Sequence, residues 1–170
     1  MAETTLPVLP GEDDRVTVAM TATTAPTDGL PALVQMAAAV PDVGVAVSDV
    51  RAADATELDC LATAVWFESR GETLEGQLAV AQTVVNRARS GRWGKGMCGV
   101  IKAPRQYNFA ASRVQRGTAT FTTALAIARI AAAGLWHDMA AGAHSFHAAR
   151  ISPRWRLTRV AKIGNHVFYR

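Results

Sequence analysis

The chain has 170 residues, of which 49% are hydrophobic and 19% are charged, and its net charge is +4 at pH 7. This composition excludes a disordered chain, and the length suits one domain with a substantial core. The two cysteines are too few for a disulfide scaffold, and no apolar stretch is long enough for a transmembrane helix.

Charge is unevenly distributed along the chain. Residues 1–56 contain eight acidic residues and two arginines, a balance of −6, whereas residues 57–170 contain 16 basic and six acidic residues, a balance of +10. A segment with this positive field attracts anionic polymers such as nucleic acid, an anionic membrane surface or the bacterial cell wall.

Residues 1–56 predict an irregular N-terminal arm or linker, because they show no sustained helical or strand period. One short helix is expected near 31–40, with Pro31 at its first position and Pro41 at its end. The acidic opening "MAETTLPVLPGEDD" predicts no cleavable signal segment. We expect this arm to contribute to a protein assembly.

Three helices are expected after the arm. Apolar residues at i, i+3, i+4 and i+7 from Leu58 onward predict a helix that stops near Gly71. A similar stripe predicts a second helix over 74–90, with Gly91 just beyond its end. The stretch "CGVIKAPRQYNFA" predicts one helical turn and then a loop. A third helix over about 118–133 has Arg129 as its only charge, which is typical of a helix buried on most sides.

The C-terminal part predicts a small antiparallel sheet. The segment "GAHSFHA" alternates in polarity, and Gly164 and Asn165 lie between two β-prone runs, a pattern typical of a tight hairpin. Helices followed by a short sheet indicate a mainly helical α+β domain over residues 57–170.

Glu68 ends the first predicted helix, in the stretch "AVWFESRGETLEG". At about 100° per residue it projects about 20° from Leu61, at the edge of the apolar stripe. A carboxyl group partly removed from water keeps its proton to higher pH, as a general acid near neutrality must, and protonation of a glycosidic oxygen is a natural use for it. The same position also fits a structural carboxylate that pairs with Arg70.

Several blocks together resemble the SleB-like cell wall hydrolase family, which includes spore-cortex-lytic enzymes. These blocks are "LDCLATAVWFESRGETLEGQLAVAQTVVNRARSGRW", "MCGVIKAPRQYNF", "GAHSFHAARISPRW" and "KIGNHVFYR", and they cover roughly residues 57–170. The resemblance implies a lysozyme-like fold that acts on the glycan strands of peptidoglycan, with Glu68 as the catalytic acid. Glu68 followed by Ser69 also resembles the catalytic pair of lytic transglycosylases, in which the serine helps to hold the acid or a sugar.

The number of acids helps to choose the reaction. A hydrolase with two carboxylates needs the second about 5 to 9.5 Å away, and Glu57 and Asp59 lie two to three turns back along the helix, which is too far. Glu72 is nearer, and it fits either a site residue or an acid at the start of the second helix. With one glutamate, lytic transglycosylase chemistry gives 1,6-anhydro products without water, metal or cofactor. A lysozyme-type muramidase that uses water is the alternative.

Other residues are candidates for substrate binding or packing. Tyr107 and Asn108 lie in a loop that can contact sugar rings, and His147 is expected to line the cleft. Phe109 fits core packing equally well, and Trp66 and Trp155 are interpreted as packing residues rather than sugar platforms. No histidine has convincing zinc spacing with a cysteine, so no metal site is expected.

Cys60 and Cys98 either form one disulfide, which would join the first helix to the loop after the second, or remain two buried thiols.

A rival hypothesis is a module without turnover, which either binds anionic polymers through its basic charge or has a structural role. No motif for reading nucleic acid is present, so no nucleic-acid partner is expected. The proposed enzyme would act in the periplasm or on the cell wall. Since no signal is evident, a phage-like particle or membrane permeabilisation would deliver it.

Overall fold

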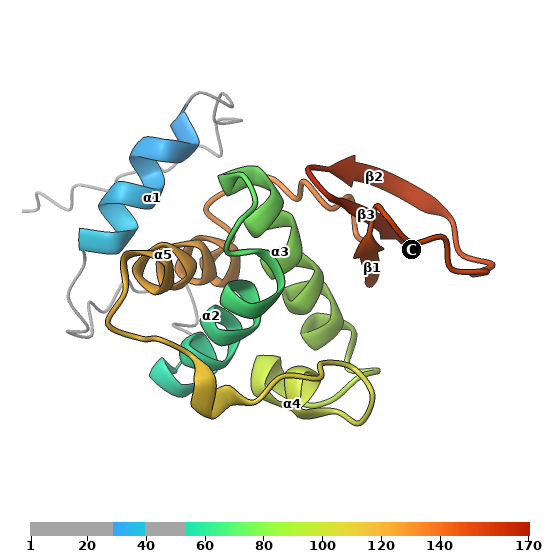
Figure 1. Cartoon of the computed structure of the whole chain (residues 1–170), viewed down its shortest axis with the longest axis horizontal. Helices are drawn as coiled ribbons and strands as arrows, with labels where there is room; N and C mark the ends of the chain where they lie inside the picture. The colour runs from blue at the N-terminus through green and yellow to red at the C-terminus, as the bar shows by residue number, and fades with distance from the viewer. Residues whose placement is uncertain (1–28, 40–53) are drawn as a thin grey trace, which may run out of the picture.

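The structure is a computed structural model that describes residues 29–39 and 54–170. It contains a helical body and, beside it, a small three-stranded sheet (Figure 1). The sequence-based prediction of a mainly helical α+β fold with a C-terminal antiparallel sheet is confirmed. Most of the predicted arm lies outside the described residues. The prediction that the arm contributes to a protein assembly therefore also concerns residues outside the described part.

The first helix, α1 (Leu30–Ala39), is the short helix expected within the arm. It packs against α5 (Ala119–Ala133), with Leu30 and Val34 buried. The division between residues 1–56 and 57–170 stays a prediction, and the α1–α5 contact shows that the helical core includes a segment from before residue 57.

Helices α2 (Ala55–Ser69) and α3 (Leu74–Ser90) lie where the apolar periodicity predicts them. The Thr73 side chain accepts a hydrogen bond from the N–H of Gly76 and caps the start of α3, while Gly91 ends α3 in the left-handed conformation, at φ +68°. Threonine at the N-cap and glycine just past the last turn are the residue types that favour these ends.

Helix α3 is more enclosed than its single apolar stripe indicates, because all residues from 76 to 85 are buried. One side contacts α2, α4 (Gly96–Lys102) and α5, and Ala79 and Val80 on another side pack with Phe168 of the sheet. Its buried Gln82 is bonded at both ends of the amide, because it donates to the carbonyl of His137 and accepts from the N–H of Met139. Helix α5 is also buried on most sides, as its composition predicts.

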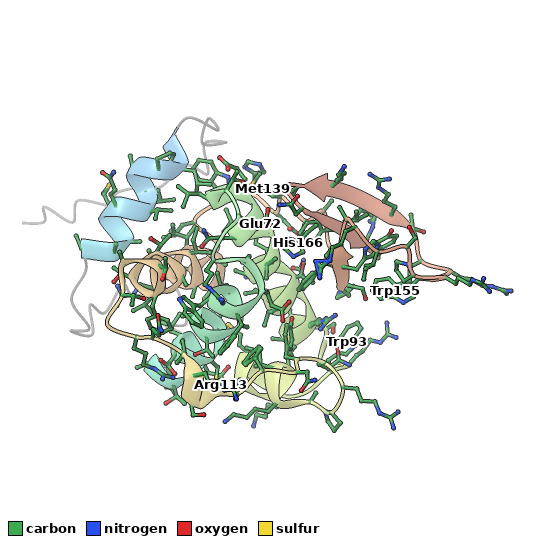
Figure 2. All side chains as sticks on the ribbon, viewed as in Figure 1. Glu72, Trp93, Arg113, Met139, Trp155 and His166 are labelled. Carbon is green, nitrogen blue, oxygen red and sulfur yellow. A yellow bond between two sulfur atoms is a disulfide. The ribbon has the colours of Figure 1, made fainter. Side chains whose placement is uncertain are left out.

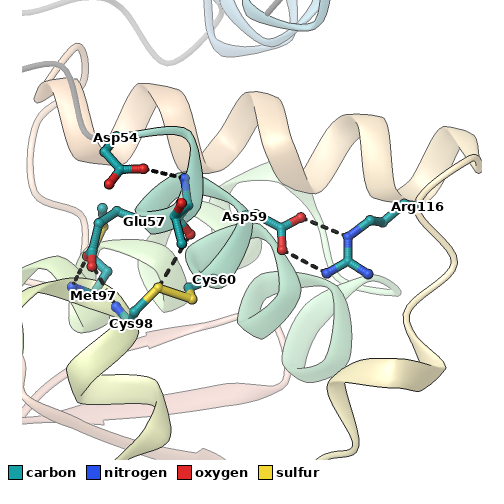
Figure 3. Close-up of a disulfide and its surroundings, with 8 residues drawn as sticks. Asp54, Glu57, Asp59, Cys60, Met97, Cys98 and Arg116 are labelled. Carbon is teal, nitrogen blue, oxygen red and sulfur yellow. Dashed lines mark hydrogen bonds and ion pairs between the residues drawn. A yellow bond between two sulfur atoms is a disulfide. The ribbon is translucent and has the colours of Figure 1, made fainter.

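A covalent and polar cluster joins α2 to α4 (Figure 3). Cys60 and Cys98, which are 38 positions apart in the sequence, form a disulfide. The Glu57 carboxylate accepts hydrogen bonds from the N–H groups of Met97 and Cys98, which are otherwise unsatisfied at the start of a helix. These contacts fix the loop after α3 against the first turns of α2.

An ion pair, also drawn in Figure 3, joins the segment that precedes α5 to helix α2. Arg116 donates two hydrogen bonds to Asp59, at 2.8 and 2.7 Å. Between Arg116 and α4 lies one short 3-10 turn, η2 (Ala111–Arg113).

The sheet has the strand order β1–β3–β2, with β1 (Ser145–Ala148), β2 (Arg159–Ile163) and β3 (His166–Tyr169) all antiparallel to their neighbours. The predicted hairpin is confirmed, and Gly164 at its turn has φ +54°. Figure 1 shows that the loop between β1 and β2 projects away from the helical body, whereas the β2–β3 turn lies toward it. The sheet therefore forms one wall of the space beside the α2–α3 junction.

Candidate active site

Glu68 lies in the last turn of α2, beside the sheet, and its side chain is half-buried. Burial raises the pKa of its carboxyl above the ordinary value. Across residues 29–39 and 54–170, no protein group hydrogen-bonds or ion-pairs with this carboxyl. The group therefore keeps its proton to higher pH than an exposed glutamate and is free to donate it to a ligand.

A cavity of about 610 Å³ lies between the α2–α3 junction and the sheet. This volume is within the range of ligand-binding pockets, about 300–1,000 Å³. Glu68 and Glu72 form the helical side of the cavity, and the sheet, its β2–β3 turn and the β1–β2 loop form the other side. In Figure 2, Glu72 and His166 lie at this helix–sheet junction and Trp155 lies farther out, beside the β1–β2 loop.

Glu72 lines the same cavity but has a different environment from Glu68. Its two carboxylate oxygens accept hydrogen bonds from the backbone N–H and the side-chain amide of Asn165, each at 3.0 Å. Burial alone would raise the pKa of Glu72, but these hydrogen bonds and the nearby His166 together lower it. The cavity thus contains two carboxyl groups with pKa values displaced in opposite directions, a pattern typical of catalytic sites.

The turn that carries Asn165 is fitted closely around Glu72. A Cβ at Gly164 would lie 2.3 Å from Oε2 of Glu72, so only glycine suits this position both in space and in backbone conformation. The hairpin turn is consequently fixed to the start of α3, which sets the width of the cavity between the two.

His147 lies on β1, and its ring is held on both nitrogens. Its Nδ1 is 2.8 Å from the carbonyl of Ala148, which can only accept, so Nδ1 carries the proton. In the neutral ring, Nε2 then accepts from the hydroxyl of Tyr169, at 2.9 Å. The rings of Trp155 and Tyr169 pack against His147. Of these three residues, His147 and Trp155 line the cavity and form its aromatic wall.

His166, on β3, is buried, and burial lowers its pKa, with an opposing influence from Glu72 and a weaker lowering one from His147. Its Nδ1 has no hydrogen-bond partner among the described residues. His166 therefore lines the cavity that Glu68 and Glu72 share as a neutral imidazole, and its unpaired Nδ1 is enclosed by the protein.

Tyr107 lies outside this cavity but close enough to Glu68 for electrostatic influence. Its hydroxyl is enclosed and unpaired among the described residues, and burial raises its pKa to about 12, with Arg87 opposing and Glu68 adding to the rise. The ring lines a second cavity of about 450 Å³, which α2 and the loop after α4 form. Tyr107 is therefore a neutral neighbour of Glu68 at neutral pH.

The structure brings together three of the residues that the sequence predicts for the site: Glu68, Glu72 and His147. Ser69 is buried, and its hydroxyl donates to the carbonyl of Val65 at 2.9 Å, so it does not face the cavity. Asn108 is exposed and lines neither cavity. The substrate contacts expected of these two residues remain predictions without geometric support.

Several residues of the cavity were not predicted from the sequence. Trp155, interpreted there as a packing residue, is 44% exposed and lines the cavity, whereas Trp66 is buried and donates to Thr120 as a packing residue does. Asn165 and His166 were assigned only to the hairpin. The alternation of arginine with apolar residues in "RISPRWRL" is the signal that could have singled out the β1–β2 loop.

The part of the chain that the structure describes contains no cluster of three or more histidine, cysteine, aspartate or glutamate residues able to hold a metal ion. It also contains no helix that is long and apolar enough to cross a membrane.

A family model described as Cell Wall Hydrolase matches residues 71–169. The chain belongs to this cell wall hydrolase family. The match begins three residues after Glu68 and includes Glu72, His147 and Trp155. The resemblance stated from the sequence is thereby confirmed.

Among characterised relatives, the chain is 32% identical to spore cortex-lytic enzymes of Bacillus cereus over 114 residues. The match includes 66% of this chain but 43% of each relative, so the chain spans less than half of their length.

Two solved structures are similar in fold. The catalytic domain of the germination-specific lytic transglycosylase SleB from Bacillus anthracis is 26% identical, with a TM-score of 0.58 over 77% of this chain and all of that domain. The SleB catalytic domain of Bacillus cereus is 27% identical, with a TM-score of 0.58 over 75% of this chain and all of that domain. The lysozyme-like fold expected from the sequence is confirmed.

Proposed function

We propose that this protein degrades peptidoglycan by cleaving the glycosidic bond between N-acetylmuramic acid and N-acetylglucosamine, as a lytic transglycosylase. The observation that carries the proposal is the sheltered carboxyl of Glu68, which opens into a cavity and has a raised pKa. Membership of the cell wall hydrolase family and the similarity to a domain described as a lytic transglycosylase support the same reaction.

In the proposed first step, the protonated Glu68 donates its proton to the glycosidic oxygen, and the bond from that oxygen to the anomeric carbon of muramic acid breaks. Glu68, now a carboxylate, takes the proton of the muramic acid 6-hydroxyl in the second step. The oxygen of that hydroxyl attacks the anomeric carbon and closes a 1,6-anhydro ring. Glu68 ends protonated, so the cycle is complete without water.

The environment of Glu72 favours this route over a muramidase that uses water. A hydrolase would need Glu72 to activate water or attack the sugar, but Asn165 already binds both of its oxygens. In the ionised state, which its lowered pKa favours, Glu72 can instead stabilise positive charge that develops on the sugar ring.

The remaining acids of the domain have structural contacts or lie outside the cavity. Glu57 caps α4, Asp59 pairs with Arg116, and Asp138 accepts from the N–H groups of Ala140 and Gly142. Glu75 lies in the first turn of α3 and does not line the cavity. Glu68 and Glu72 are thus the two acids available to a sugar there.

The aromatic wall gives the cavity a surface suited to sugar rings. Trp155 is partly exposed and is fixed by contacts with His147 and Tyr169, so it can pack against a ring face without first being ordered. His147 and Trp155 would then position the strand, while Glu68 acts on its bond.

The positive charge of residues 57–170 suits an anionic polymer, and cell wall peptidoglycan is one. The protein would act in the periplasm or on the cell wall. A module that binds such a polymer without turnover is the alternative, and it predicts no released products. Carriage on a phage-like particle has no support in the fold or in the similar proteins.

Mass spectrometry of the products from purified peptidoglycan tests the proposal. The native protein should release muropeptides with anhydro ends, which are lighter by one water than the products of a muramidase, and Glu68→Gln should release none. Muropeptides with reducing ends would support the muramidase. Retained activity in Glu68→Gln would remove Glu68 as the catalyst, and binding to the polymer without release of products would support the module without turnover.

A further inference from the structure

We propose that the β1–β2 loop forms an anion-binding rim on the cavity, and that this rim recognises the carboxylates of the stem peptide on the muramic acid residue. The rim consists of Arg150, Ile151, Arg154, Trp155 and Arg156. This inference rests on the proposed function, because it assigns a second part of the same substrate to the same site.

The first observation is an imbalance of charge around the sheet. From Met139 to Arg170 the chain contains six basic residues and no acid. Arg150, Arg154 and Arg156 are exposed, and no described residue forms an ion pair or a side-chain hydrogen bond with any of them. Such arginines repel one another unless a group other than the described residues supplies negative charge.

The second observation is that the loop is part of the cavity wall. Arg150, Ile151 and Trp155 line the cavity together with Glu68, so a ligand that reaches the acid passes along them. Arg154 and Arg156 flank Trp155 in the sequence. All three belong to the β1–β2 loop, which Figure 1 shows projecting away from the helical body. The positive charge thus begins inside the cavity and continues outward from it.

The third observation is the apolar content of the rim. Ile151 is 49% exposed and Trp155 is 44% exposed, and they lie among the arginines. A peptide with carboxylates and methyl-bearing residues needs both kinds of contact, and the guanidinium group suits carboxylates because it can donate two parallel hydrogen bonds.

The geometry favours the stem peptide over an anionic membrane. A stem peptide is attached to the sugar whose bond Glu68 would break, so it must leave the cavity along its wall. Membrane insertion would instead bury Trp155, a residue whose contacts with His147 and Tyr169 place it at the cavity. The rim would therefore favour glycan strands that carry stem peptides over strands from which the stem peptides are absent.

The test compares kcat/KM on soluble glycan strands that carry stem peptides with kcat/KM on the same strands after an amidase has removed the peptides. We expect a ratio of about ten for the native protein. The triple substitution Arg150→Gln, Arg154→Gln and Arg156→Gln should bring this ratio close to one, because each exposed ion pair contributes a factor of about 1.5 to 5. Higher ionic strength should also reduce the native ratio.

A matched control removes three positive charges elsewhere, from exposed arginines that do not line the cavity: Arg89, Arg105 and Arg113. Their replacement by glutamine should leave the ratio at the native value. A ratio that uses two substrates of one protein is insensitive to partial loss of folded enzyme, so poor folding of the rim variant does not imitate the expected result.

Different failures have different signatures. If the native protein cleaves neither substrate, the proposed function is wrong. If it cleaves both with equal kcat/KM, or if the rim variant keeps the native ratio, the reaction stands and the rim proposal is overturned. If the native protein sediments with phosphatidylglycerol vesicles, the rim variant does not, and the ratio is the same in both, the loop binds membrane instead.

Discussion

The fit of the β2–β3 turn around Glu72 makes a quantitative prediction for Gly164→Ala. The backbone of Gly164 has φ +54°, a conformation that costs an alanine about 1–2 kcal/mol. The new Cβ would also lie 2.3 Å from Oε2 of Glu72, which forces the carboxylate away from Asn165. Loss of these two partly exposed hydrogen bonds adds about 1–2 kcal/mol, so the total is about 2–4 kcal/mol.

Gly91→Ala is the matched control. Gly91 has nearly the same conformation, at φ +68°, and no atom lies within 4 Å of the position where its Cβ would be. It should show the backbone cost alone, about 1–2 kcal/mol. In a protein of this size each kcal/mol lowers Tm by about 2–4 °C, so the extra loss in Gly164→Ala should appear as about 2–8 °C.

Thermal unfolding and activity on peptidoglycan, measured on both variants, check this reasoning. Gly164→Ala should also lose activity, because Glu72 and Asn165 line the cavity, while Gly91→Ala should retain it. Equal Tm values and equal activities in the two variants would refute the claim that Glu72 holds the turn.

Three further predictions concern the acid, the aromatic wall and the disulfide. Burial raises the pKa of Glu68, so ionisation costs stability as pH rises through the raised pKa, and Glu68→Gln should match or exceed the native Tm at neutral pH although it is inactive. Trp155→Ala should lower kcat/KM about tenfold on peptidoglycan with little change in Tm, whereas Trp66→Ala should cost about 3–5 kcal/mol in urea unfolding. Replacement of Cys60 and Cys98 by serine should cost about 4 kcal/mol, since their separation of 38 residues closes a long loop in the unfolded chain.

Local sequence signals were sufficient for the helices and the hairpin. The apolar periods of α2 and α3, Thr73 and Gly91 at the ends of α3, and the Gly164–Asn165 turn are each determined by residues near one another in sequence. The degree of burial of α3 was not predictable in the same way. Ala79 and Val80 are too small to mark a second apolar face, and they are buried only because Phe168 packs on them.

The candidate site likewise has features that nearby residues predict and features that depend on residues far away in the sequence. The position of Glu68 at the edge of an apolar stripe predicts its half-buried state and raised pKa, because both depend on its own helix. The partner of Glu72 lies 93 residues away, on a turn that periodicity cannot place beside α3. The exposure of Trp155 likewise depends on how the β1–β2 loop folds back over His147.

The central claim is that Glu68 holds the catalytic proton because the protein shelters it. The most direct measurement follows the Glu68 carboxyl by carbon-13 NMR across pH and compares its titration with the pH dependence of kcat/KM. The carboxyl should titrate above its ordinary value, about 4.3, and the alkaline fall in kcat/KM should coincide with that titration. A carboxyl that titrates at or below the ordinary value, or an alkaline fall that belongs to another group, would contradict the account.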